Sequence, residues 1–155
     1  MENALQRIRS VADYQFGKGV GSKLFPRIVQ ITFSKRTGRI RYVFLDNVRL
    51  ATLRPTDGLF SLSVAGAQRI IDTKAHARCH VKVRDDVSKY IMEGGDVFAA
   101  HVVEADDEIR SKDEVIVVDG ENRVLAVGRA ALSGEEMKAF KRGVAVRVRH
   151  GVLET

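Results

Sequence analysis

Apolar and polar residues recur with two different periods along this chain of 155 residues, and these periods predict an order of helices and strands. Apolar residues at helical spacing run over residues 3–16 and again over residues 64–71. Between these stretches, alternating runs bounded by turn residues predict four short strands. We expect these strands at residues 28–33, 39–45, 48–53 and 59–62. Helices that cover one face of such an antiparallel sheet form an α+β domain.

The second half of the chain predicts a small, mostly antiparallel sheet that closes or nearly closes. A strand at 78–83 and a helix at 85–92 come first. Four β-like runs follow between residues 97 and 148, with the sequences VFAAHVV, EVIVV, VLAVGRAAL and VAVRV. The chain therefore continues as a mostly-β unit, a pseudo-barrel, after its α+β beginning.

Two local signals fix the order of elements inside this second sheet. The segment Asp119-Gly120-Glu121-Asn122 separates two of the β-like runs and is typical of a hairpin turn. Ser133 and Glu136 have the spacing of a capping box, in which both side chains satisfy backbone N–H groups at a helix start. We expect one short helix at 134–140, directly before the last strand.

Charge is distributed unequally between the two halves. Residues 1–77 hold 13 Lys and Arg against 5 Asp and Glu, a net charge of +8, whereas residues 78–155 hold 13 against 15, a net charge of −2. Together with the change of pattern, this predicts two domains, 1–75 and 76–155. A compact basic domain favours a polyanionic partner such as nucleic acid, and plain solubility is the alternative.

Several classes of protein are disfavoured by the sequence. No apolar run approaches the roughly 20 residues that span a bilayer, so no membrane contact is expected. The N-terminal residues lack an apolar signal core, which predicts a cytoplasmic protein. The single cysteine, Cys79, excludes an internal disulfide.

Residues with catalytic or metal-binding chemistry are present but poorly arranged. His76, Cys79 and His80 lie close together without a second cysteine or a matched pair, which is typical of a structural region and not of a zinc site. The acidic run from Asp106 to Glu108 could bind Mg²⁺ or act as a base, but such runs on loops are usually solvated. We therefore expect no catalytic residue, no metal and no cofactor in this chain.

Basic residues in three regions are better candidates. The loop from Gly17 to Gly21 could hold a phosphate through its backbone N–H groups, with Lys18 and Lys23 adding charge, or could be a flexible turn. Arg39 and Arg41 alternate with Ile40, Tyr42 and Phe44, so each set should occupy one face of a strand, although a solvated charged face is the alternative.

Near the C-terminus, Arg147 and Arg149 should likewise share a face, with Lys141 and Arg142 close by in the sequence. Aromatic residues are few and tryptophan is absent, so stacking on single strands is less favoured than recognition of folded RNA by its shape and backbone.

The second half resembles the PUA domain, an RNA-binding module. The resemblance lies in the segments EGGDVF at 93–98, KDEVIVV at 112–118 and AVGRA at 126–130, in this order. It implies a PUA-type pseudo-barrel over residues 76–155. The residues that we expect to contact RNA across both domains are Lys18, Lys23, Arg36, Arg39, Arg41, Gly94, Gly95, Lys138, Lys141, Arg142, Arg147 and Arg149.

The first half resembles the domain that precedes the PUA domain in archaeosine tRNA-guanine transglycosylases. The similar segments are IRSVADYQFGKG at 8–19, LFP at 24–26, SKRTGRIR at 34–41 and LRPTDGLF at 53–60. In that family these C-terminal domains grip tRNA, and a TIM barrel of about 200 residues or more carries the reaction. This chain is too short to contain that barrel as well.

The resemblance implies a non-catalytic, tRNA-binding part of a split archaeosine transglycosylase, because the similar region here starts with its own methionine. Its partners would be tRNA, on the acceptor-stem and D-arm side, and a separate TIM-barrel chain. A stand-alone RNA-binding adaptor and a piece of archaeosine synthase are the alternatives. A homodimer also stays open.

Overall fold

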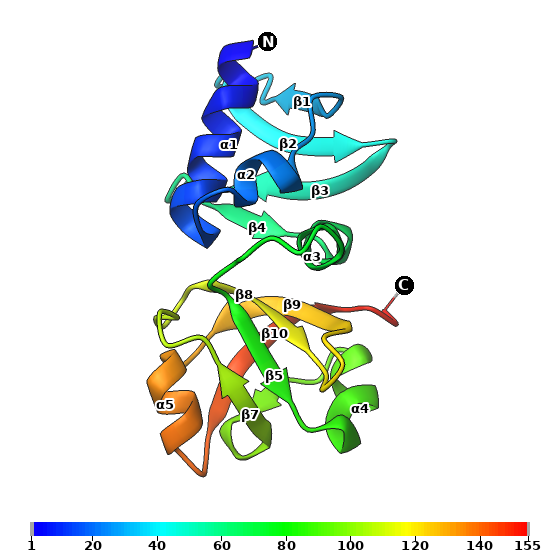
Figure 1. Ribbon diagram of the computed structural model, residues 1–155. Helices are drawn as coiled ribbons and strands as arrows, with labels where there is room; N and C mark the ends of the chain where they lie inside the picture. The colour runs from blue at the N-terminus through cyan, green and yellow to red at the C-terminus, as the bar shows by residue number, and fades with distance from the viewer. Residues whose placement is uncertain (1, 155) are drawn as a thin grey trace. The chain divides into compact units, whose positions relative to one another are not determined.

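A computed structural model describes residues 2–154, and the chain divides into two compact units after residue 77 (Figure 1). No helix among the described residues is both long and apolar enough to cross a membrane. The first unit is α+β and the second is a barrel-like sheet with short helices. This fold class is the one that the residue pattern predicts.

The first unit is a four-stranded antiparallel meander, sheet A, with the strand order β1-β2-β3-β4. Its elements are α1 (Glu2–Phe16), α2 (Val20–Leu24), β1 (Gln30–Phe33), β2 (Ile40–Leu45), β3 (Val48–Leu53), β4 (Phe60–Leu62) and α3 (Val64–Asp72). Ile8, Ala12 and Phe16 of α1 follow each other at intervals of four residues and are buried. This spacing places them on one side of the helix, facing the core.

The short helix α2 was not expected from the sequence. The segment that holds it was interpreted as a flexible loop because of its glycines. Two of these glycines have other functions, since Gly19 starts the helix with a φ of 90° and Gly21 lies against α1. A Cβ atom at Gly21 would stand 2.2 Å from the carbonyl oxygen of Arg9, so only glycine permits this approach.

Two β-bulges decide which side chains of sheet A face the helices. Tyr42 pairs with Thr32 and Ile40 pairs with Phe33, so Arg41 is an extra residue in β2. A second bulge makes Leu50 the extra residue in β3. Each bulge shifts the alternation of faces by one position.

The shift overturns one expectation for β2. The buried row across sheet A consists of Ile31, Val43, Ala51 and Leu62, which lie opposite one another. Tyr42 therefore lies on the outer face, away from the helices. Ile40, expected to share the face of Tyr42, is buried instead, because the bulge at Arg41 separates the two.

Two hairpin loops of the same construction close the same end of sheet A. In the loop 34–39, the first N–H donates to the last carbonyl at 2.7 Å, and the glycine N–H donates to the first carbonyl at 2.8 Å. The loop 54–59 repeats both bonds at 2.8 and 2.9 Å. Gly38 and Gly58 both have a φ of 72°, a conformation that glycine adopts without strain. Both loops are thus held rigid by their own backbone.

The second unit is built on sheet B, whose strand order is β6-β10-β9-β8-β5-β7. Its elements are β5 (His80–Val83), η1 (Asp85–Val87), α4 (Ser88–Met92), β6 (Val97–Phe98), η2 (Ala99–His101), β7 (Val102–Ala105), β8 (Glu114–Val118), β9 (Val124–Ala130), α5 (Gly134–Ala139) and β10 (Val144–Gly151). All pairings are antiparallel except that of β5 with β8. The run VFAAHVV is therefore not one strand, since a 3₁₀ turn divides it into β6 and β7.

Two predicted local signals are confirmed in this unit. The Ser133 hydroxyl accepts the Glu136 N–H at 3.1 Å, and the Glu136 carboxylate accepts the Ser133 N–H at 2.9 Å, which completes the capping box of α5. Asp119 organises the hairpin turn between β8 and β9. Its buried carboxylate accepts the N–H groups of Glu121 and Arg123, both at 2.9 Å, and the Arg123 Nε–H at 2.7 Å.

The turn makes the stability of the second unit depend on pH. Burial raises the pKa of Asp119, but the hydrogen bonds from Arg123 and Glu121 lower it more, so the pKa lies below its usual range. A depressed carboxyl pKa stabilises the fold above the unfolded pKa of about 3.9, and this contribution disappears as the pH falls through the folded pKa. Denaturant unfolding of the wild type should therefore show a loss of stability below about pH 4 that is smaller in Asp119→Asn. Equal losses in both proteins would contradict this role of Asp119.

Candidate RNA interface

A hollow of about 390 Å³ lies at the end of sheet A that carries the two hairpin loops. Four arginines and two hydroxyl side chains contribute to its wall, and no aspartate or glutamate does. The lining residues are Ser34, Arg36, Thr37, Arg39, Ile40, Arg41, Leu53, Arg54, Pro55 and Gly58. A concave surface with one sign of charge focuses the field and attracts groups of opposite charge. The hollow therefore suits phosphate groups.

The arginines of this hollow, which we call the arginine hollow, differ in how their charge is balanced. Arg54 donates to both carboxylate oxygens of Asp57, at 3.1 and 3.0 Å, and its Nη1 donates to Ser61 Oγ at 3.2 Å. In contrast, Arg36, Arg39 and Arg41 have no carboxylate within 4.0 Å in the described part of the chain. Three of the residues expected to contact RNA therefore come together here without an ion-pair partner among the described residues. Arg54, which the sequence analysis does not single out, lines the same hollow and is held in place by Asp57.

The outer face of sheet A continues this basic surface with aromatic rings. The guanidinium carbon of Arg41 lies 5.4 Å from the centre of the Tyr42 ring, and that of Arg49 lies 5.8 Å from it. Phe44 meets the same ring edge-on, with 6.2 Å between centroids. Each cation–π contact contributes about 0.5–1 kcal/mol at an exposed site, so the two arginines are held beside the ring. We call Arg41, Tyr42 and Arg49 the tyrosine platform.

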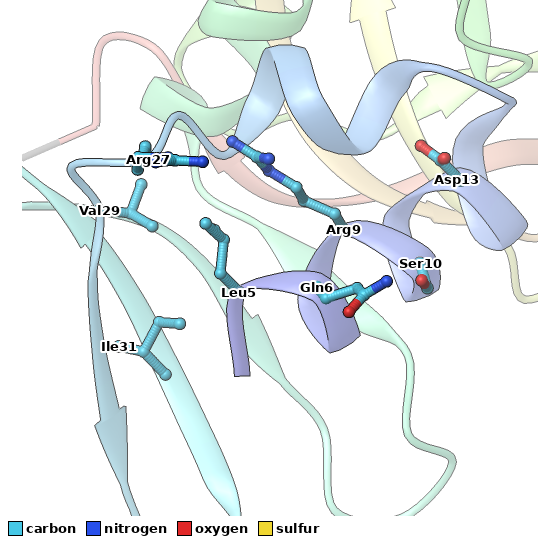
Figure 2. A pocket seen from close by; sticks show the side chains of 8 residues that line it. All are labelled: Leu5, Gln6, Arg9, Ser10, Asp13, Arg27, Val29 and Ile31. Atoms are coloured by element: carbon cyan, nitrogen blue, oxygen red, sulfur yellow. The ribbon is translucent and has the colours of Figure 1, made fainter. Parts of the chain in front are cut away.

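A second hollow of the first unit, of about 420 Å³, lies between α1 and β1 (Figure 2). Two of its polar side chains, those of Arg9 and Asp13, hold the fold together. Arg9 donates to the Phe25 carbonyl at 2.9 Å, and Asp13 accepts the Gly21 N–H at 2.7 Å, which fastens α2 to α1. This hollow is therefore part of the scaffold that positions sheet A.

The glycine loop after α1 uses several of its backbone N–H groups inside the fold. The N–H of Val20 donates to the Gly17 carbonyl at 3.1 Å, and the N–H of Gly21 is bound by Asp13. Lys23 donates to the Thr73 carbonyl at 3.2 Å, whereas Lys18 is exposed. Because three N–H groups of the loop, those of Gly17, Val20 and Gly21, have internal acceptors, fewer of them can face a phosphate. RNA contacts of Lys18 and Lys23 stay a prediction.

The basic residues of the second unit have more internal partners than those of the first. Lys138, on α5, forms an ion pair with Asp107, and Arg147 lies 3.9 Å from a carboxylate oxygen of Asp96. The Arg147 side chain is nevertheless 71% exposed. Lys141 and Arg142 follow α5 and are exposed. Several positive charges of this unit thus have a carboxylate of the same unit nearby.

Arg149 is the clearest case of internal pairing. It forms two hydrogen bonds with Glu114, one of them at 3.1 Å between Nη1 and Oε1, and Glu114 is only 2% exposed. Arg147, Arg129 and Glu114 lie opposite one another on β10, β9 and β8, so their side chains share one face of sheet B. Arg149 is the extra residue of a bulge in β10, and its bonds to Glu114 place its side chain on the face of Arg147.

Gly94 and Gly95 end helix α4 and serve the fold directly. Gly94 has a φ of 105°, and a Cβ atom at Gly95 would stand 2.3 Å from the ring of Tyr90. A Cβ atom at Gly94 would meet the carboxylate of Glu154 at 2.8 Å, so a negative charge already occupies this neighbourhood. Contacts of these glycines with RNA stay a prediction.

The titrating groups of the second unit include a buried thiol and a His80–Asp106 pair. The described residues contain no group of three or more His, Cys, Asp or Glu side chains placed to hold a metal ion. Burial raises the pKa of the Cys79 thiol, and the carboxylates of Asp106 and Glu114 raise it further. Partial burial raises the pKa of Asp106, but hydrogen bonds from the backbone and ring of His80 lower it more, so this carboxyl is ionised.

Comparisons with known protein families agree with the two units. Residues 6–76 match the patch-forming domain C2 of tRNA-guanine transglycosylase, and residues 80–152 match the PUA domain. A tRNA-guanine(15) transglycosylase of Pyrococcus furiosus is 40% identical over 153 residues, which is 99% of this chain and 26% of the relative. The corresponding protein of Methanobrevibacter smithii is 38% identical over 96% of this chain and 22% of its own length. The chain thus spans about a quarter of these relatives.

Solved structures share the whole two-unit fold. A hypothetical protein from Pyrococcus horikoshii superimposes with a TM-score of 0.78 and 26% identity, covering 100% of this chain and 93% of that chain. A PUA domain protein from Thermoplasma acidophilum has a TM-score of 0.68 and 21% identity, covering 99% of this chain and 91% of that chain. The same arrangement therefore occurs in other chains of similar length.

The buried pair of Arg149 and Glu114 predicts a structural penalty for losing the arginine. Arg149→Ala should lower the free energy of unfolding of the second unit by about 3 kcal/mol, because it removes a cation that pairs with the buried Glu114 carboxylate. The double variant Arg149→Ala/Glu114→Gln should recover part of this loss. Arg147→Ala is the control and should stay within about 0.5 kcal/mol of the wild type. Denaturant unfolding measures all three, and an unchanged stability of Arg149→Ala would show that the pair contributes nothing.

Proposed function

We propose that the chain is a non-catalytic, tRNA-binding subunit of a split archaeosine transglycosylase. The matches of residues 6–76 to the patch-forming domain C2 of tRNA-guanine transglycosylase and of residues 80–152 to the PUA domain support this proposal. It positions tRNA, and a separate TIM-barrel chain exchanges the base. The observation that carries the proposal is the arginine hollow, in which three arginines lack a carboxylate partner.

Charge supports RNA as the polyanion. The first unit has a net charge of +8, and within its described residues Arg54–Asp57 is the ion pair that forms. Phosphate contacts by lysine and arginine release condensed counterions, which supplies much of the affinity of proteins for nucleic acids. The two units together contact the acceptor-stem and D-arm side of the tRNA, with the PUA unit at the end of the acceptor stem, as the resemblance implies.

The extent of similarity supports a division of labour. The chain covers 22–26% of the transglycosylase relatives. The proposal assigns the base exchange to a different chain. That chain supplies the barrel and its active-site groups, and the two units described here supply affinity and orientation for the tRNA.

A stand-alone RNA-binding adaptor is the second candidate. It is favoured by the Pyrococcus horikoshii structure, in which a chain of nearly the same length has the same two units. Purification of the native protein from its own cells separates the two candidates. Recovery together with tRNA and a barrel chain supports the split transglycosylase, whereas tRNA without a barrel chain supports the adaptor. Absence of any RNA would contradict both.

Loss of one unpaired arginine should change the salt dependence of tRNA binding. Arg39→Gln should weaken binding and lower the slope of log K against log salt by about one, because one phosphate contact disappears. Arg147→Gln should do the same from the second unit. Arg7→Gln, an exposed arginine of α1, is the matched control and should leave the slope unchanged. Electrophoretic mobility shifts over a salt series measure these slopes, and identical slopes in Arg39→Gln and Arg7→Gln would place the hollow off the interface.

A further inference from the structure

The arginine hollow and the tyrosine platform share a residue. Arg41 contributes to the wall of the hollow and also lies 5.4 Å from the centre of the Tyr42 ring. It can be shared because the bulge in β2 makes Arg41 the extra residue beside Tyr42. A site for an anion and a site for a flat group therefore adjoin on the outer face of sheet A.

The flat site is built from the two kinds of surface on which nucleobases stack. Aromatic rings and arginine guanidinium planes both hold unpaired bases by their faces, and the guanidinium carbons of Arg41 and Arg49 lie 5.4 and 5.8 Å from the centre of the Tyr42 ring. Phe44 supports the ring from the side, and Arg49 is exposed. Although the whole chain contains few aromatic residues, this face contains two of them, Tyr42 and Phe44, beside two arginines.

Hydroxyl groups complete the anion site. Ser34 and Thr37 line the hollow, and their hydroxyl oxygens accept the N–H groups of Thr37 and Arg39, both at 3.3 Å. A hydroxyl that accepts such a bond still has its own O–H to donate to a phosphate oxygen. The hollow thus offers guanidinium and hydroxyl donors together, and a carboxylate does not compete within its lining.

We propose that the outer face of sheet A binds one unpaired nucleotide of an RNA strand, with its base on the tyrosine platform and its phosphate in the arginine hollow. A base inside a duplex cannot reach the platform, because its faces are covered by its neighbours. The occupant is therefore a splayed or single-stranded nucleotide. This inference rests on the proposed tRNA binding and adds that the first unit selects an unpaired position within the tRNA.

The test compares two short single-stranded probes of equal length, an oligoadenylate and an oligomer with the same ribose-phosphate backbone but no bases. Tyr42→Leu should bind the oligoadenylate about tenfold more weakly than the wild type and the abasic oligomer equally well, since only stacking is lost. Tyr42→Phe keeps the ring and should bind both probes like the wild type. Arg39→Gln should weaken binding to both probes, because both have phosphates.

Controls separate this inference from the proposal on which it rests. Tyr14→Leu removes another exposed tyrosine, on α1, and should change neither probe's affinity. Circular dichroism and the midpoint of thermal unfolding establish that Tyr42→Leu is folded. Failure of the wild type to bind tRNA would reject the proposed function itself. Intact tRNA binding together with equal effects of Tyr42→Leu on both probes, or no effect on either, would reject only the nucleotide site. Equal affinity of the wild type for the abasic oligomer, for polyglutamate and for oligoadenylate would also reject it and would indicate an acidic protein segment as the occupant.

Discussion

Three like charges held together without a counter-charge are the dominant constraint on the first unit. Arg36, Arg39 and Arg41 repel one another in the free protein, and this repulsion works against the compact state. The hairpin loops keep them in place through backbone hydrogen bonds that do not depend on charge. A ligand that brings negative charge removes the repulsion and stabilises the folded form by mass action. Binding and folding of this unit are therefore linked through its arginines.

The two units differ in how many of their basic residues form ion pairs with carboxylates of the same unit. In the second unit, Lys138 and Arg149 form ion pairs with nearby carboxylates. A residue in such an ion pair must exchange its carboxylate for the phosphate, so the net gain in binding free energy is small. Net positive charge is thus concentrated in the first unit, with +8 against −2 in the second.

Signals between residues close in the sequence predicted the fold well. Features that depend on pairing between distant residues could not be predicted. The capping box at Ser133 depends on two residues three positions apart, so the sequence alone reveals it. The bulge at Arg41 depends on register against β1, which no residue type in β2 encodes. The partner of Arg149 is 35 residues away on β8, beyond any periodicity argument. Consequently the basic residues of the site could be named from the sequence, but their sorting into unpaired and internally paired groups required the structure.

The chain has a single cysteine, and its position has a practical consequence. Cys79 is 4% exposed, and burial raises the pKa of its thiol, so both access and the nucleophilic thiolate are suppressed in the folded protein. Reaction with a disulfide reagent then requires an opening of the PUA unit. The rate of this labelling reports on the opening of that unit alone, without any engineered probe, and a tRNA that grips the unit would slow it.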